Sequence, residues 1–328
     1  MNELLKNSKV LVTGGAGFIG SALVENLLAS GNEVVCLDNF ATGKPENISD
    51  FQNNKNFHFI EGDIRIPEDC RKAIAGVKVV LHQAALGSVP RSVKDPITTN
   101  DVNISGFLNM ITAASDAGVK RFVYASSSSV YGDHPDLPKK EENTGNPLSP
   151  YAVTKKVNEL YAKVFGELYG METIGLRYFN VFGCRQDPEG EYAAVIPRFV
   201  KSLIYYEPPV VFGDGSQTRD FTYIENVVQA NMLAAVTKNQ EAYNSAYNVA
   251  FGERVTLNEL FFMLREGLAK FDPKISGINP IYTNARQGDI PHSLASIYKT
   301  SKFLGYHPQF NLQQGLEQSI KWYWEHLR

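Results

Sequence analysis

The chain has 328 residues, of which 43% are hydrophobic and 20% are charged, and its formal net charge is −3. An apolar content at this level can bury the core of one or two domains, so the composition excludes a disordered chain. The near balance of 32 basic and 35 acidic residues leaves no electrostatic footprint for nucleic acid.

Strands and helices alternate through the first half of the chain. Short apolar runs predict strands at residues 9–13, 33–38, 57–61, 77–84, 121–126 and 173–177. Helical periodicity predicts helices at residues 17–30, 67–75, 98–117 and 151–169. This alternation predicts βαβ units and a Rossmann-like α/β fold with a doubly wound parallel sheet.

The pattern loosens after about residue 180, where Pro and Gly interrupt it often. A helix near 225–238 and a strand at 246–249 are predicted to return to the sheet. We therefore predict a sheet domain of residues 1–180 with about 220–250, and a smaller mixed α/β lobe of residues 181–219 and 251–328. The lobe is predicted to close with a helix that carries Trp322 and Trp324.

Cysteine spacing and apolar run length exclude several classes of protein. Cys36, Cys70 and Cys184 lack CxxC spacing, which argues against a disulfide framework and against a zinc site, so we expect no metal. No apolar run approaches the roughly 20 residues that a membrane span needs. The first six residues include an acid and lead directly into a strand, so we expect no signal peptide and a cytoplasmic protein.

A glycine-rich segment joins the first strand to the first helix. Gly14, Gly17 and Gly20 permit a tight turn and a close backbone approach, so that helix N–H groups can face a pyrophosphate. Asp38 ends the next strand, where a carboxylate can accept hydrogen bonds from ribose hydroxyls. Asn39 follows it, and no Arg stands there to neutralise a 2′-phosphate. The segment therefore predicts a dinucleotide site that favours NAD over NADP.

Two further strand ends are predicted to lie beside the dinucleotide. Asp63 follows the third strand and is interpreted either as an adenine-side contact or as a turn residue. Small residues after the fourth strand, at 84–85, would let the dinucleotide cross the strand ends. His82 is interpreted as a buried structural histidine.

Tyr151 and Lys155 stand four residues apart in a predicted helix and therefore share one face. A phenol with its usual pKa of about 10 is a poor base at pH 7. A nearby ammonium, together with the positive nicotinamide of NAD⁺, would lower that pKa, so that Tyr151 could exchange a proton with a substrate hydroxyl. The serine run 126–129 ends the fifth strand and supplies a hydroxyl at the same edge of the sheet.

These motifs together resemble the extended short-chain dehydrogenase/reductases, and specifically the nucleotide-sugar 4-epimerases. Segments 84–91, 131–135, 147–155 and 176–183 look most like the UDP-N-acetylglucosamine 4-epimerases of bacterial polysaccharide synthesis. The resemblance covers almost the whole chain. It implies inversion at C4 of UDP-GlcNAc to give UDP-GalNAc through a transient 4-keto sugar, with tightly bound NAD.

The resemblance also implies a role for each matching residue. The catalytic residues would be Ser127, Tyr151 and Lys155. The residues expected to hold NAD are Gly14, Gly17, Phe18, Ile19, Gly20, Asp38, Asn39, Gly43, Asp63, Ile64, Gln83, Ala84, Ala85, Asn103, Ser126, Tyr151, Lys155 and Tyr178. The residues expected to hold the UDP-sugar are Gly87, Ser88, Ser127, Ser128, Ser129, Tyr151, Asn180, Ala194, Val195, Arg219, Arg286, Asp289 and Ser293.

Some of these roles are more specific. Asn103 would support the active-site lysine or a bound water, unless it is only a polar residue inside a helix. Asn180, Arg219 and Arg286 would contact the diphosphate, since the planar guanidinium binds two oxygens together. Asp289 would contact the uridine ribose.

Two small residues point to an N-acetylated sugar. Ser293 stands where epimerases restricted to non-acetylated sugars typically have a large Tyr, and Ala194 stands where they carry Asn. Gly87 and Ser88 stand where the narrower enzymes have a lysine. The smaller side chains would leave room beside C2 of the hexose.

Four other functions are weighed against this prediction. A UDP-N-acetylglucosaminuronate or UDP-glucuronate 4-epimerase is the main alternative, because Arg91 would pair with the carboxylate of such a sugar. A 4,6-dehydratase usually has an Asp-Glu pair where this chain has Ser128 and Ser129. A net dehydrogenase or reductase would exchange its cofactor in each turnover, and a non-catalytic NAD sensor would be expected to lack Tyr151 or Lys155.

The resemblance also implies a homodimer formed through the helices near 98–117 and 151–169. The second helix carries more apolar residues than one sheet face needs, namely Val157, Leu160, Val164, Phe165 and Leu168. The simpler interpretation is burial against the sheet and the adjoining lobe.

Overall fold

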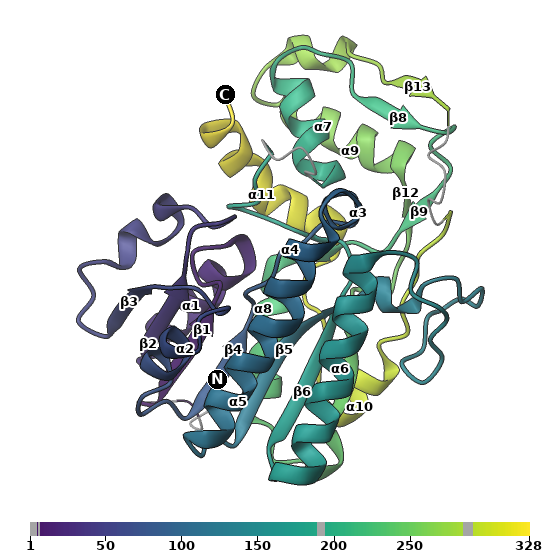
Figure 1. Cartoon of the computed structure of the whole chain (residues 1–328). Helices are drawn as coiled ribbons and strands as arrows, with labels where there is room; N and C mark the ends of the chain where they lie inside the picture. The colour runs from purple at the N-terminus through teal and green to yellow at the C-terminus, as the bar shows by residue number, and fades with distance from the viewer. Residues whose placement is uncertain (1–4, 6, 189–193, 285–290) are drawn as a thin grey trace.

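A seven-stranded parallel sheet forms the centre of the molecule in the computed structural model, which describes residues 5, 7–188, 194–284 and 291–328 (Figure 1). The strands are β1 (Lys9–Thr13), β2 (Glu33–Asp38), β3 (Phe57–Glu61), β4 (Val79–His82), β5 (Arg121–Ser127), β6 (Glu172–Tyr178) and β11 (Ser245–Val249). Their order is β11-β6-β5-β4-β1-β2-β3. The order reverses between β1 and β4, and such a switch point opens a crevice at the carboxyl ends of the strands. The predicted Rossmann-like doubly wound sheet is confirmed.

Helices cover both faces of the sheet because successive strand side chains point to opposite sides. Val10 and Val12 of β1 pack with α1 (Phe18–Ala29) and α8 (Ile224–Val236), whereas Leu11 packs on the other face. That second face is covered by α2 (Pro67–Ala73), α5 (Phe107–Asp116) and α6 (Pro150–Tyr169) (Figure 1).

The helix predicted at 98–117 is present, but its middle turn is π-helical. It consists of α4 (Pro96–Asn100), the π-helical turn η2 (Asp101–Gly106) and α5, and the short helix α3 (Val89–Lys94) precedes it. In this turn the carbonyl of Asn103 accepts a hydrogen bond from Asn158 Nδ2 of α6 at 2.7 Å. A π-helical turn of this kind is frequent at functional sites.

The remaining elements form short helices and small sheets. The helices are α7 (Val195–Ile204), α9 (Leu257–Ala269), α10 (Tyr298–Leu304) and α11 (Leu312–His326), and the 3-10 turns are η1 (Pro45–Phe51), η3 (Ser128–Tyr131), η4 (Gln240–Ala242) and η5 (Pro273–Gly277). Three strand pairs complete the fold: β7 (Val181–Phe182) with β10 (Thr222–Tyr223), β9 (Thr218–Arg219) with β12 (Val255–Thr256), and β8 (Val210–Phe212) with β13 (Ile281–Thr283). Trp322 and Trp324 lie on α11, as predicted. The division into two domains stays a prediction.

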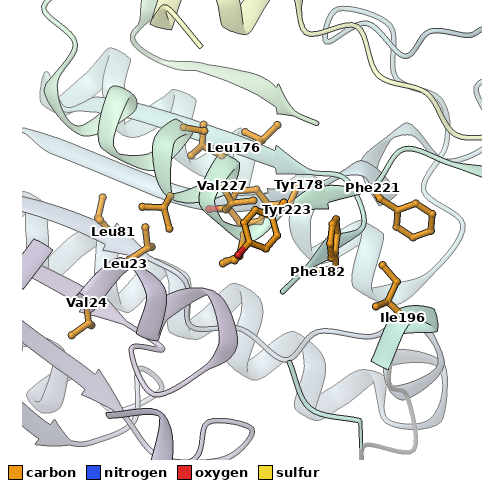
Figure 2. Close-up of a cluster of buried hydrophobic side chains, with 14 of the residues drawn as sticks. Leu23, Val24, Leu81, Leu176, Tyr178, Phe182, Ile196, Phe221, Tyr223 and Val227 are labelled. Carbon is orange, nitrogen blue, oxygen red and sulfur yellow. The ribbon is translucent and has the colours of Figure 1, made fainter. Parts of the chain in front are cut away.

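One apolar cluster joins the sheet to the smaller elements. Figure 2 shows it extending from Leu23 and Val227, between the sheet and its covering helices, through Phe182 to Ile196 of α7 and Phe221. Because this packing is continuous, the strand ends and the smaller elements are held together on either side of the crevice. No helix among the described residues is long and apolar enough to cross a membrane.

Candidate active site

A cleft of about 390 Å³ lies at the carboxyl ends of the central strands. It is lined by nearly all the predicted cofactor residues, namely Gly14, Gly17, Phe18, Ile19, Gly20, Asp38, Asn39, Asp63, Ile64, Gln83, Ala84, Ala85, Ser126, Tyr151, Lys155 and Tyr178. Residues from six strand ends therefore meet in one place, at the switch point where a dinucleotide is expected. Gly87, predicted to contact the sugar, also lines this cleft.

The glycine turn has no room for side chains. Gly14 has a φ of +67°, and a Cβ added at Gly20 would lie 2.0 Å from the Gly14 carbonyl oxygen. Gly17 caps α1 without a side-chain hydrogen bond, so the first N–H groups of the helix have no side-chain partner there. A helix N-terminus whose N–H groups are unpaired by side chains, and which a ligand can approach closely, is suited to bind a pyrophosphate. The turn therefore fits the dinucleotide that the sequence predicts.

Asp38 is positioned by the glycine turn. Its carboxylate is 8% exposed and accepts hydrogen bonds from the N–H groups of Ala16 at 2.9 Å and Phe40 at 2.8 Å. Burial raises the pKa of Asp38, while these backbone donors oppose that rise. The carboxylate keeps further lone pairs, which suit ribose hydroxyls. Arg65 also lines the cleft, but its guanidinium pairs with Asp63 at 2.6 Å.

Two predicted cofactor residues do not line the cleft. Gly43 packs against Ala16, where an added Cβ would lie 2.9 Å from the Ala16 carbonyl carbon. Asn103 accepts a hydrogen bond from the Leu86 N–H at 2.7 Å and donates to Thr154 Oγ1 at 3.2 Å. Its side chain therefore holds the loop after β4 against α6, and its hydrogen bonds do not reach Lys155.

Tyr151 and Lys155 lie on the first turns of α6. The helix begins at Pro150, with the Ser149 hydroxyl accepting a hydrogen bond from the Ala152 N–H. Lys155 Nζ donates to the Ala125 carbonyl at 2.9 Å and lies 5.9 Å from the centre of the Tyr151 ring. Burial lowers the pKa of Lys155 to about 8.

Burial raises the pKa of Tyr151, and only its hydrogen bond with Ser127 opposes that rise. The predicted lowering of this pKa is therefore not a property of the protein groups alone. The positive charge of a bound cofactor would act in the lowering direction.

The serines at the end of β5 point in different directions because strand side chains alternate. Ser126 Oγ donates to Glu159 Oε1 at 2.7 Å on α6, behind the cleft. Ser127 Oγ accepts from the Ser129 N–H at 3.1 Å and bonds with Tyr151. Ser127 is thus the serine of this run that contacts the Tyr151 hydroxyl.

His82 is a structural residue, as the sequence suggests. Its Nδ1 lies 2.9 Å from Thr13 Oγ1, and its ring packs against Phe107 and Phe122. Burial lowers the pKa of His82 to about 3, so the ring is neutral. It packs beneath the strand ends and is 3% exposed.

A second cavity of about 530 Å³ adjoins the cleft, and Tyr151 lines both. It contains the predicted substrate residues Ser88, Ser127, Ser128, Ser129, Asn180, Arg219 and Ser293. Ser88 and Asn180 have positive φ angles of 96° and 34°, a strained backbone that is common where ligands bind. Lys139 and His292 also line this cavity, and no local motif singles them out.

A third cavity of about 260 Å³ continues from the second, since Asn180 and Arg219 line both. Ala194 and Val195, predicted from the resemblance, line it together with Phe212, which the sequence analysis did not identify. A phenyl ring beside a guanidinium suits a nucleotide base and its phosphates. Arg286 and Asp289, also predicted to hold the substrate, lie outside the described residues.

The chain matches the NAD dependent epimerase/dehydratase family over residues 10–250. The UDP-glucose 4-epimerase of Mycolicibacterium smegmatis is 36% identical over 318 residues, which cover 96% of this chain and 98% of that protein.

Two solved structures are similar throughout their length. The UDP-N-acetylglucosamine 4-epimerase of Methanobrevibacter ruminantium, in complex with UDP-N-acetylmuramic acid, is 40% identical with a TM-score of 0.90, over 97% of this chain and 98% of that one. The UDP-glucuronic acid 4-epimerase of Bacillus cereus, in complex with UDP-glucuronic acid and NAD, is 32% identical with a TM-score of 0.86, over 97% and 99%.

Proposed function

This chain belongs to the NAD dependent epimerase/dehydratase family, and from that premise we propose that it interconverts UDP-GlcNAc and UDP-GalNAc by inverting C4 of the hexose. 4-Epimerisation of a UDP-sugar is the activity named for these three relatives, and the Bacillus cereus structure contains NAD. The choice of an N-acetylated hexose is our proposal, and it is supported by the small side chains of Ser293 and Ala194, which line the second and third cavities.

The position of Tyr151 carries the chemical argument. It lines both the cofactor cleft and the second cavity, so its hydroxyl can meet a sugar at the boundary between them. NAD held in the cleft by the glycine turn and Asp38 would supply hydride chemistry at C4. Tyr151 would take the proton of the 4-hydroxyl and give it back, as a general base and then a general acid. Lys155 would stabilise the Tyr151 phenolate, and Ser127 would be hydrogen-bonded to the same 4-hydroxyl during the transfer.

Inversion further requires the 4-keto sugar to present its other face. Arg219 and Asn180 line both the second and the third cavity, so they can hold the diphosphate while the hexose stays in the wider second cavity. A firm hold on the nucleotide and a loose hold on the hexose would allow that rotation.

Ser293→Tyr is expected to lower kcat/KM for UDP-GlcNAc by about tenfold or more while sparing UDP-glucose, because the added ring removes volume beside C2. Both rates are measured by proton NMR. Ser301→Tyr, on α10 away from the cavities, controls for the bulk of the new side chain. Equal losses on the two sugars would contradict the proposed pocket.

Proton NMR of the purified protein with UDP-GlcNAc, and no added NAD, tests the reaction itself. The galacto epimer is expected to accumulate to an equilibrium mixture because the reaction has no net redox change. An accumulation of NADH, seen only after NAD is supplied, would instead show a dehydrogenase.

We propose that the chain forms a homodimer through the helices near 98–117 and α6. Leu160 and Leu168 of α6 are 56% and 71% exposed, whereas Phe165 is buried against the sheet and takes no part. Light scattering is expected to give twice the 36.4 kDa of one chain. Leu160→Glu with Leu168→Glu should yield monomers, whereas Tyr298→Glu, at an equally exposed position on α10, should not. A monomeric wild type would refute the proposal.

A further inference from the structure

Lys139 is a buried cation in the wall of the second cavity. It lies in the loop between η3 and α6, is 6% exposed and lines the cavity with Ser127, Tyr151 and Ser293. Its ammonium donates a hydrogen bond to the His134 carbonyl. An ammonium carries three N–H donors, and among the described residues no carboxylate lies within ion-pair distance of this one.

The backbone of Lys139 is fixed at this place by long-range contacts. Its N–H donates to the Leu294 carbonyl at 2.7 Å, and its carbonyl accepts from the Ser296 N–H at 2.9 Å. Asn248 Nδ2 of β11 donates to the same carbonyl at 2.9 Å. Lys139 is therefore paired with the segment that directly follows Ser293, and both residues line the second cavity.

The charges around this cavity are unbalanced. Its lining contains Lys139 and Arg219 but, among the described residues, no Asp or Glu. Burial lowers the pKa of Lys139, while the exposed Asp136 acts in the opposite direction. Ser129 Oγ, in the same lining, is buried without a hydrogen-bond partner among the described residues.

Arg219 can bind the diphosphate, since it also lines the third cavity. That assignment leaves the ammonium of Lys139, a residue that is only 6% exposed, without an anion among the described residues, and a buried charge is costly unless it is paired. A second negative group on the substrate would supply the missing partner. The uncharged hydroxyls of the lining, Ser129 among them, can complete its hydrogen bonds.

We propose that Lys139 determines specificity by binding a carboxylate carried by the hexose, so that the enzyme accepts acidic UDP-N-acetylhexosamines in addition to neutral ones. This inference rests on the proposed UDP-sugar 4-epimerase function. The acetyl group at C2 and the carboxylate occupy different parts of the sugar, so the Ser293 pocket and the Lys139 contact are compatible. The carboxylate is either that of a uronic acid at C6 or that of a lactyl ether at C3.

The test compares three substrates in the holoenzyme: UDP-GlcNAc, UDP-GlcNAcA with its C6 carboxylate, and UDP-N-acetylmuramate with its lactyl group. Lys139→Met is expected to lower the ratio of kcat/KM for the acidic substrate to kcat/KM for UDP-GlcNAc by about 10- to 100-fold, as expected for a charge-assisted hydrogen bond. Lys139→Arg should restore most of the ratio. Lys140→Met, at the exposed neighbouring position, is the matched control and should leave the ratio unchanged. The acidic substrate that responds identifies the position of the carboxylate.

If Lys139→Met does not fold, the binding of acidic UDP-sugars to the wild-type enzyme is measured instead. Calorimetry on the NAD-loaded enzyme should then show at least one acidic UDP-sugar binding as tightly as UDP-GlcNAc or more tightly. An unchanged ratio in a folded Lys139→Met enzyme, or a wild type that rejects both acidic sugars while epimerising UDP-GlcNAc, would overturn the inference alone. A wild type that epimerises none of the three sugars would overturn the proposed function itself.

Discussion

Tyr151→Phe is expected to lower kcat for UDP-GlcNAc epimerisation by about 10²- to 10⁴-fold, the usual contribution of a positioned general acid–base group. The substitution removes one oxygen and keeps the ring, so the packing of α6 and the volume of both cavities are preserved. Because Tyr151 acts on the proton of the 4-hydroxyl, KM is expected to change much less than kcat. Single-turnover NMR or a coupled assay measures both constants.

Tyr161→Phe is the matched control for this experiment. It removes the same hydroxyl from the same helix at a position that packs with the α2–α5–α6 side of the sheet and lies outside the three cavities. Its kcat should equal that of the wild type. A Tyr151→Phe enzyme that kept more than a tenth of the wild-type kcat would assign the proton transfer to another group.

Arg177→Met is expected to lower the free energy of unfolding by about 3–5 kcal/mol, since it leaves a buried carboxylate without its partner. The guanidinium and the Glu159 carboxylate form a two-point contact, at 2.8 Å and 2.9 Å, and the two side chains are only 4% and 10% exposed. Arg177 also donates to Tyr131 Oη at 3.0 Å. Urea unfolding of the NAD-loaded proteins measures the loss.

Lys321→Met tests whether this cost reflects burial. Lys321 pairs with Glu325 at 3.7 Å on the surface of α11, where the side chains are 72% and 52% exposed. Exposed pairs of this kind contribute little, so the midpoint of unfolding should hardly move. A cost for Arg177→Met below about 1 kcal/mol would mean that water or a rearranged side chain reaches Glu159.

The sheet is predictable because most of its strands are buried on both faces. Residues 9–13, 33–38 and 57–61 are predicted as strands and coincide with β1, β2 and β3. Strands covered by helices on both sides read as apolar runs, and the turns that bound them are marked by Gly, Asn and Asp. The alternation of these runs with helices then leaves a parallel sheet as the simplest arrangement.

The helix predicted at 98–117 is present, but the sequence does not predict its π-helical turn at Asp101–Gly106. In that turn the carbonyl of Asn103 accepts a hydrogen bond from the side-chain amide of Asn158, 55 residues further along the chain. The local spacing of apolar residues cannot reveal this contact. The strands outside the main sheet are two or three residues long, too short for an alternation to be recognised.

Some residues of the candidate site can be predicted from the sequence and others cannot. Gly14, Asp38, Tyr151 and Lys155 belong to local motifs whose chemistry can be read from spacing, and the structure brings them together in one cleft. Lys139 belongs to no motif. It reaches the cavity because its backbone pairs with a segment more than 150 residues away, and only the folded chain shows that pairing.

The order of the strands along the chain also determines which parts of the site are synthesised first. Every described residue that lines the cofactor cleft lies at or before Tyr178, so the cleft can assemble on the ribosome from β1 to β6 before the rest of the chain emerges. Asn231 of α8 then arrives and donates to Tyr178 Oη at 2.9 Å, and β11 pairs with β6. A nascent chain stalled after residue 178 would therefore expose the outer edge of β6, which is the point at which it would depend most on a chaperone.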